Sequence, residues 1–107
     1  MDAGVLEKLR RICLALPETT EALSWGHPNF RVKNKIFCSI GDYKEVCSIS
    51  FKVGKAIQGV YLEDPRFFKT PYVGQHGWVS LRVTARPNWK EIKGLAEESY
   101  RLISGKD

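Results

Sequence analysis

The sequence predicts a two-layer α+β domain, in which helices at both ends of the chain pack on one face of an antiparallel sheet of four to five strands. Two terminal segments carry apolar residues at helical spacing, and the middle of the chain alternates between apolar and polar residues. The connections between the alternating segments are short, as in antiparallel sheets. Each helix has one apolar stripe and the sheet has one apolar face, so a single shared core buries all three. The 107 residues fit one domain, residues 1–107.

The first helix is predicted over residues 3–16, where apolar residues recur at every third or fourth position. Asp2 can cap its start, and Pro17 ends it because the residue before a proline is disfavoured in helical conformation. We expect residues 17–26 to form a connector, with a helical turn at 20–23.

Four strands are predicted, at residues 30–33, 35–40, 46–53 and 78–84. Turns are expected at 34–35 and 41–44, where Asn, Gly and Asp occur. The inward-facing residues on three of these strands are expected to be Phe30, Val32, Cys47, Ile49, Phe51, Val53, Val79, Leu81 and Val83. On the strand at 35–40, alternation places Ile36, Cys38 and Ile40 on one face.

Residues 54–63 suit a short helix, and residues 67–77 read as a loop rich in aromatic residues, Gly and Pro. The last helix is predicted to begin after Asn88, which can cap it, with Glu91 at the capping-box position. Gly105 is typical of a helix C-terminus.

The outward face of the sheet combines cations, hydroxyls and an indole. Its predicted members are Arg31, Lys33, Ser48, Ser50, Lys52, Ser80 and Arg82, with Trp78 and Phe37 joining them. Lys and Arg neutralise phosphates, hydroxyls donate to phosphate oxygens, and an exposed indole stacks on a base. The same composition also fits a solvated sheet face or a protein interface.

The first functional hypothesis is therefore a non-catalytic domain that binds DNA electrostatically and with little sequence specificity. Its candidate binding residues are Arg31, Lys33, Lys52 and Arg82 on the sheet, with Arg66, Lys69 and Trp78 near the adjacent loop. Residues 51–107 carry ten Lys or Arg against six Asp or Glu, which makes an anionic partner plausible. The overall net charge of +5 also fits a charge that only maintains solubility.

The alternative hypothesis is a small-ligand or protein-interaction module that uses an aromatic pocket. Its candidate residues are Trp25, His27, Tyr72, His76 and Trp78, with Arg66 or Lys69 countering an acidic group of the ligand. Trp25 and Tyr72 could instead plug the ends of a small core.

No catalytic or metal-binding motif is present, so we expect no enzymatic activity, no cofactor and no metal. The two histidines lack partners at ligand spacing. Three widely spaced cysteines favour a reducing compartment, here the cytoplasm, over a disulfide framework. No apolar stretch approaches the ~20 residues that span a bilayer, so no membrane association is expected. A monomer is favoured.

Several short motifs occur together in a characteristic order along nearly the whole chain. They are Cys13-Leu14-Ala15-Leu16-Pro17, Ser24-Trp25-Gly26 with Pro28 and Phe30, Lys35-Ile36-Phe37, Thr70-Pro71-Tyr72 with Gly77-Trp78-Val79, and Trp89-Lys90-Glu91-Ile92. In this respect the chain resembles the MmcQ/YjbR-like family of small bacterial proteins. The resemblance implies an α+β two-layer fold and DNA binding through a double-wing arrangement, which has been proposed for members. The chain departs from the family pattern before the tryptophan, where His, Asn and Lys are replaced by Gly74-Gln75-His76-Gly77. This change removes a cation from the loop.

Overall fold

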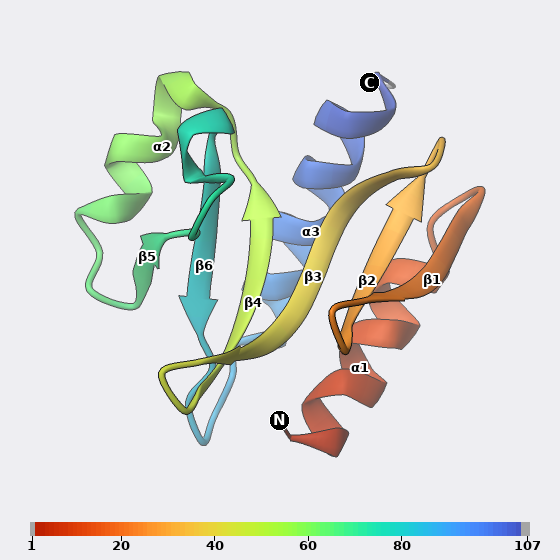
Figure 1. The fold of residues 1–107 in the computed structure, drawn as a ribbon, viewed down its shortest axis with the longest axis horizontal. Coiled ribbons are helices and arrows are strands. Elements are labelled where there is room, and N and C mark those ends of the chain that lie inside the picture. Colours follow the sequence, from red (N-terminus) through yellow and green to blue (C-terminus); the bar gives the residue numbers. More distant parts are fainter. Residues whose placement is uncertain (1, 106–107) are drawn as a thin grey trace.

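A computed structural model describes residues 2–105 and places two helices on one face of a six-stranded antiparallel sheet (Figure 1). The elements are α1 (Ala3–Leu14), β1 (Thr19–Ser24), β2 (His27–Val32), β3 (Lys35–Tyr43), β4 (Val46–Lys52), α2 (Lys55–Leu62), β5 (Phe67–Lys69), the 3-10 turn η1 (Gly74–His76), β6 (Trp78–Arg82) and α3 (Trp89–Ser104). The strand order is β1-β2-β3-β4-β6-β5. This confirms the predicted α+β class, with one strand more than the upper end of the expected range.

The helix ends follow the predicted caps. The Asp2 side chain accepts hydrogen bonds from the first turn of α1, and the Asn88 side chain accepts one from the N–H of Glu91. Gly105 closes α3 in the left-handed conformation, at φ 73°. α1 ends at Leu14, two residues earlier than expected. α3 has 16 residues, and no helix between residues 2 and 105 is long and apolar enough to cross a bilayer.

The prediction of a connector at residues 17–26 is wrong, because most of this segment forms the edge strand β1. Every residue of β1 pairs with β2, from Thr19 opposite Val32 to Ser24 opposite His27. The pairing satisfies backbone groups that a helical turn at 20–23 would have satisfied locally. The missed signal is Trp25-Gly26, a two-residue hairpin turn.

All three hairpins in the meander close through two residues with positive φ. These pairs are Trp25-Gly26, Lys33-Asn34 and Lys44-Glu45. Positive φ at both positions gives a turn whose twist matches that of the flanking strands. The second and third turns therefore differ from the predicted positions, and residues 41–43 extend β3 instead of forming a turn.

A β-bulge in β3 corrects the predicted orientation of Ile36 and Phe37. Phe30 lies opposite Cys38 while the next residue, Arg31, lies opposite Ile36, so Phe37 is an extra residue in β3. Phe37 is therefore fully buried against α3, with its ring 5.5 Å from that of Tyr100. Ile36 lines the opposite face of the sheet.

The core lies between the sheet and the two terminal helices, while α2 lies beside β5 and β6 (Figure 1). The predicted inward-facing residues all belong to this core or pack against it. Ser99 of α3 joins the two layers with two hydrogen bonds. Its hydroxyl accepts from the N–H of Lys52 at 2.9 Å and donates to the carbonyl of Phe37 at 2.6 Å.

Candidate ligand-binding face of the sheet

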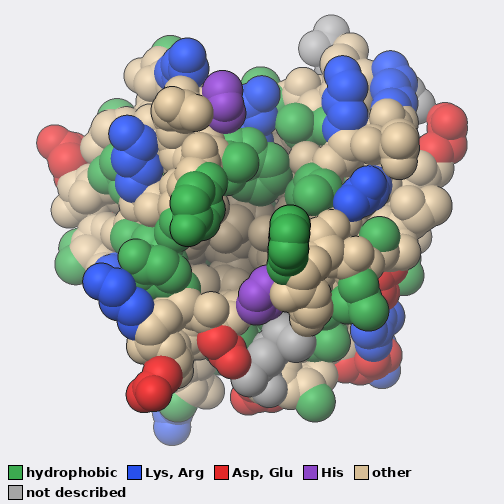
Figure 2. Space-filling model, in the orientation of Figure 1, with side chains coloured by type: hydrophobic (Ala, Val, Ile, Leu, Met, Phe, Trp, Pro, Cys, Tyr) green, Lys and Arg blue, Asp and Glu red, His purple; other side chains and the backbone are tan. Residues whose placement is uncertain are grey.

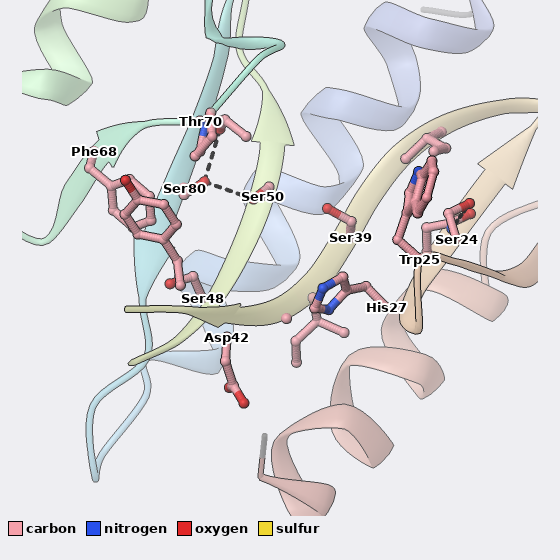
Figure 3. Close-up of a pocket in the computed structure, with 16 residues that line it drawn as sticks. Ser24, Trp25, His27, Ser39, Asp42, Ser48, Ser50, Phe68, Thr70 and Ser80 are labelled. Carbon is pink, nitrogen blue, oxygen red and sulfur yellow. Dashed lines mark hydrogen bonds between the residues drawn. The ribbon is translucent and has the colours of Figure 1, made fainter. Parts of the chain in front are cut away.

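The sheet face turned away from α1 and α3 is hollowed at its centre (Figures 1 and 2). The hollow has a volume of about 360 Å³. Residues of β2, β3, β4 and β6 form its floor. The β1–β2 turn lies on one side, and residues 68–71 lie on the other (Figure 3). This face, called the concave face below, brings together parts of the two surfaces that the sequence predicts as separate alternatives.

Hydroxyl groups form the floor of the hollow. Ser39, Ser50 and Ser80 lie opposite one another on β3, β4 and β6. The Ser80 oxygen lies 2.8 Å from that of Ser50 and 2.9 Å from that of Thr70, which makes a chain of three hydroxyls (Figure 3). Ser80 is only 2% exposed, so the centre of this face is recessed rather than a flat solvated surface.

One wall of the hollow is built from stacked aromatic rings. The rings of Tyr43 and Phe68 are 5.0 Å apart and nearly parallel, and both residues line the hollow. The guanidinium of Arg82 lies 4.7 Å from the Phe68 ring and donates to the carbonyl of Pro65 at 2.7 Å. Arg82 is therefore oriented by neutral groups at this edge.

On the opposite side, Arg31 is held by an amide and a hydroxyl. Its Nε donates to Oδ1 of Asn29 at 2.9 Å, and its Nη2 donates to the hydroxyl of Ser24 at 3.2 Å. Asn29 is buried and donates to the same Ser24 hydroxyl. Within residues 2–105, no carboxylate lies within 4 Å of the Arg31 guanidinium. Its charge is thus fixed in direction but not neutralised.

Two aromatic side chains project beside the hollow. Trp25 lines it from the β1–β2 turn and is 97% exposed. Tyr72 follows Pro71, which lines the other side, and is 96% exposed. Neither residue plugs the core. Figure 2 shows hydrophobic side chains on both sides of the hollow, Lys and Arg side chains above it and to its sides, and Asp and Glu side chains below it.

The structure brings together only part of the predicted cationic set. Arg31 and Arg82 lie at the edges of the concave face, and Lys52 lies on the same side of β4 as Ser48 and Ser50. Lys33 instead donates to the carbonyl of Ser104 at 2.7 Å, at the end of α3.

The two remaining predicted cations, Arg66 and Lys69, are engaged elsewhere. Arg66 forms ion pairs with Asp64 at 2.7 Å and with Glu91 at 2.8 Å. Hydrogen bonds from Arg66 lower the pKa of Asp64. The stem of Lys69 packs against Gly74.

The predicted aromatic pocket is likewise divided. Trp25 and His27 line the hollow, where the imidazole of His27 packs on Gly41, so that a side chain at position 41 would require His27 to move. Tyr72 stands beside it. Trp78 is buried, so its ring is not available for stacking on a ligand. His76 is exposed on η1 and does not line the hollow.

The sequence predicted Ser48, Ser50 and Ser80 on the outward face of the sheet but did not assign them to the aromatic pocket. It missed other polar residues that line the hollow, among them Asn29, Ser39, Asp42 and Thr70. The sequence signal was present in the serines of three strands, but only the register of the strands brings them into one row. Among the described residues, no group of three or more His, Cys, Asp or Glu side chains is placed to hold a metal ion.

Residues 14–102 match the YjbR family. The chain belongs to the YjbR family. The family resemblance of the sequence is thereby confirmed. Two solved structures have the same fold. Protein DR2400 of Deinococcus radiodurans, which has a DUF419 domain, aligns with a TM-score of 0.81 at 18% identity, covering 94% of this chain and 79% of its own.

A protein from Pseudomonas syringae is the second solved structure with this fold. It aligns with the YjbR chain at a TM-score of 0.72 and 18% identity, covering 96% of this chain and 99% of its own. No curated protein matches the chain. At 18% identity, these similarities establish the YjbR fold and carry no residue roles.

Proposed function

We propose that this YjbR protein is a non-catalytic module that binds DNA on the concave face of its sheet. The observation that carries the proposal is the contrast between its arginines. Arg10, Arg66 and Arg101 lie 2.6–2.8 Å from carboxylates, whereas Arg31 and Arg82 are held by neutral groups. An oriented but unneutralised guanidinium suits a phosphate ligand.

The floor of the concave face supports binding rather than catalysis. The hydroxyls of Ser50, Ser80 and Thr70 bond to one another, and within residues 2–105 no hydrogen bond joins His27 to a hydroxyl of this floor. A nucleophile and its base would need to lie within hydrogen-bond reach of each other. The three cysteines are free, which favours a reducing compartment such as the cytoplasm. The bacterial source follows from the family resemblance alone, and we take the binding unit to be a monomer.

The salt dependence of DNA binding tests this proposal. DNA binding is measured by fluorescence anisotropy between roughly 20 and 200 mM salt. The triple variant Arg31→Gln, Lys52→Gln, Arg82→Gln should reduce the slope of log affinity against log salt by about 2 to 3. The reason is that binding releases about one counterion fewer for each phosphate contact that is lost. Lys33 is left unchanged because it contacts α3.

A matched control variant changes the net charge by the same amount, but on the helix side of the molecule. The variant Arg11→Gln, Lys90→Gln, Lys93→Gln alters exposed residues of α1 and α3 and should retain the wild-type slope. Equal losses in the two triple variants would show that only net charge matters. An absence of DNA binding by the wild type at low salt would end the proposal.

A small planar acid is a second candidate ligand, favoured by the size of the hollow. About 360 Å³ lies within the range of small-molecule sites, and its walls are aromatic. A thermal-shift screen with mononucleotides and aromatic acids tests it. A true ligand should raise the melting temperature in step with the logarithm of its excess.

A further inference from the structure

We propose that the ligand of the concave face is an unpaired nucleic-acid strand, whose bases stack on Trp25 and Tyr72. This inference rests on the proposed function and names the form of nucleic acid that the face accepts. It follows from the two exposed rings, their backbone conformations, and the chemistry of the surface between them.

The exposed positions of these two rings cost backbone strain. Trp25 and Tyr72 have φ values of 55° and 68°, in a region that is unfavourable for bulky residues. Both are more than 95% exposed, so packing within the described residues contributes almost nothing to offset that strain. Positive φ at non-glycine residues occurs in hairpin turns as well as at sites that contact a ligand, and of the seven described non-glycine residues that have it, Trp25 and Tyr72 are the two with aromatic rings.

Hydrogen bonds hold the loop that carries Tyr72. The backbone N–H of Gly74 donates to the carbonyl of Thr70 at 2.8 Å, which closes the loop that carries the ring. Gln58 of α2 donates to the carbonyls of Gly74 and Trp78, at 2.6 and 2.9 Å. These bonds hold the backbone of the loop in place, so the position from which the Tyr72 side chain projects is defined.

Unpaired strands and duplexes differ in whether the faces of their bases are accessible. In a duplex each base lies between its neighbours, so a protruding aromatic ring finds no free base face. Unpaired bases offer that face, and stacking on them tolerates any sequence. The recessed hydroxyl floor lies between Trp25 and Pro71, the residue before Tyr72, and Arg31 and Arg82 flank it with positive charge for the phosphates. The carboxylate of Asp42, which also lines the hollow, points away from the hydroxyl floor (Figure 3).

Competition binding tests the inference. A labelled 12-nucleotide DNA strand is displaced by the unlabelled strand, by an RNA strand of the same sequence, by the corresponding duplex and by a mononucleotide. Either strand should compete at least tenfold better than the duplex or the mononucleotide. Trp25→Ala and Tyr72→Ala should each weaken strand binding about five- to hundredfold, with little change in duplex binding.

Two controls separate stacking from structural effects. Trp25→Phe keeps a stacking ring and should restore most of the affinity that Trp25→Ala loses. Leu23→Ala removes another exposed side chain, 71% exposed, from the same hairpin and should leave strand binding unchanged. The fold of each variant is checked by circular dichroism.

The possible results separate strand binding through Trp25 and Tyr72 from DNA binding on the concave face in general. Duplex binding that equals or exceeds strand binding, and that Trp25→Ala does not change, would overturn the inference while leaving DNA binding intact. A mononucleotide that competes as well as the strand would also overturn it, in favour of a small ligand. If no nucleic acid binds, both fail.

Discussion

At the scale of the residue, Trp25 shows how one position can favour ligand contact over stability. It is the first residue of a two-residue hairpin turn, where φ is 55°, and Gly26 follows at 77°. Asn and Gly adopt this conformation readily, whereas a bulky residue adopts it only at a cost. The ring is 97% exposed, so its removal sacrifices almost no packing.

We therefore expect Trp25→Asn to stabilise the protein by about 0.5–1 kcal/mol while weakening strand binding. Urea denaturation measures the first effect, and the titrations described above measure the second. Trp25→Ala is the matched control, because alanine keeps the unfavourable φ and should give no gain in stability. A loss of stability in Trp25→Asn would mean that the ring contributes packing.

At the scale of the element, an ion pair joins α1 to the edge strand β1. The guanidinium of Arg10 contacts both carboxylate oxygens of Glu21, at 2.6 and 2.9 Å. Hydrogen bonds from Arg10 lower the pKa of Glu21 below its ordinary value of 4.5. The pair connects the first helix to a strand that has only one neighbouring strand.

The sign of the pKa shift determines how this contact depends on pH. Because the folded-state pKa of Glu21 is lowered, its stabilising contribution is complete above about pH 4.5 and is lost as the pH falls through the folded value. Glu21→Gln should therefore lower stability at pH 7, and this deficit should shrink as the pH falls below about 4.5. Urea denaturation at a series of pH values from 7 downward checks this, with exposed Glu45→Gln as control. A deficit independent of pH would contradict it.

At the scale of the whole molecule, the two layers are joined by packing and by Ser99. Its hydroxyl connects α3 to both β3 and β4 and is completely buried. Ser99→Ala would leave a backbone N–H and a carbonyl without this partner. We expect a loss of about 1–3 kcal/mol in the free energy of unfolding.

Chemical denaturation of Ser99→Ala measures this loss, and the exposed substitution Thr84→Ala serves as control. A change below about 0.5 kcal/mol would mean that the two backbone groups find other partners. Nucleic-acid binding by the folded fraction should persist, because Ser99 lies on the opposite side of the sheet from the hollow.

The sequence by itself determined the layers of this protein and the ends of its helices. Apolar periodicity identifies both helices and most of the strands, and Asp2, Asn88 and Gly105 act within a few residues of their own position. The ordered motifs also identified the family. These features are local, so neighbouring residues are enough to specify them.

Only the tertiary structure decided which residues form the candidate site. Lys33 contacts a carbonyl 71 positions away, and the hydroxyls of Ser50 and Ser80 meet across 30 positions. The bulge at Phe37 depends on how β3 pairs with β2. Such contacts are set by register and packing between distant segments, and alternation within one strand carries no information about them. The hollow, its hydroxyl floor and its two oriented arginines therefore exist only in the folded chain.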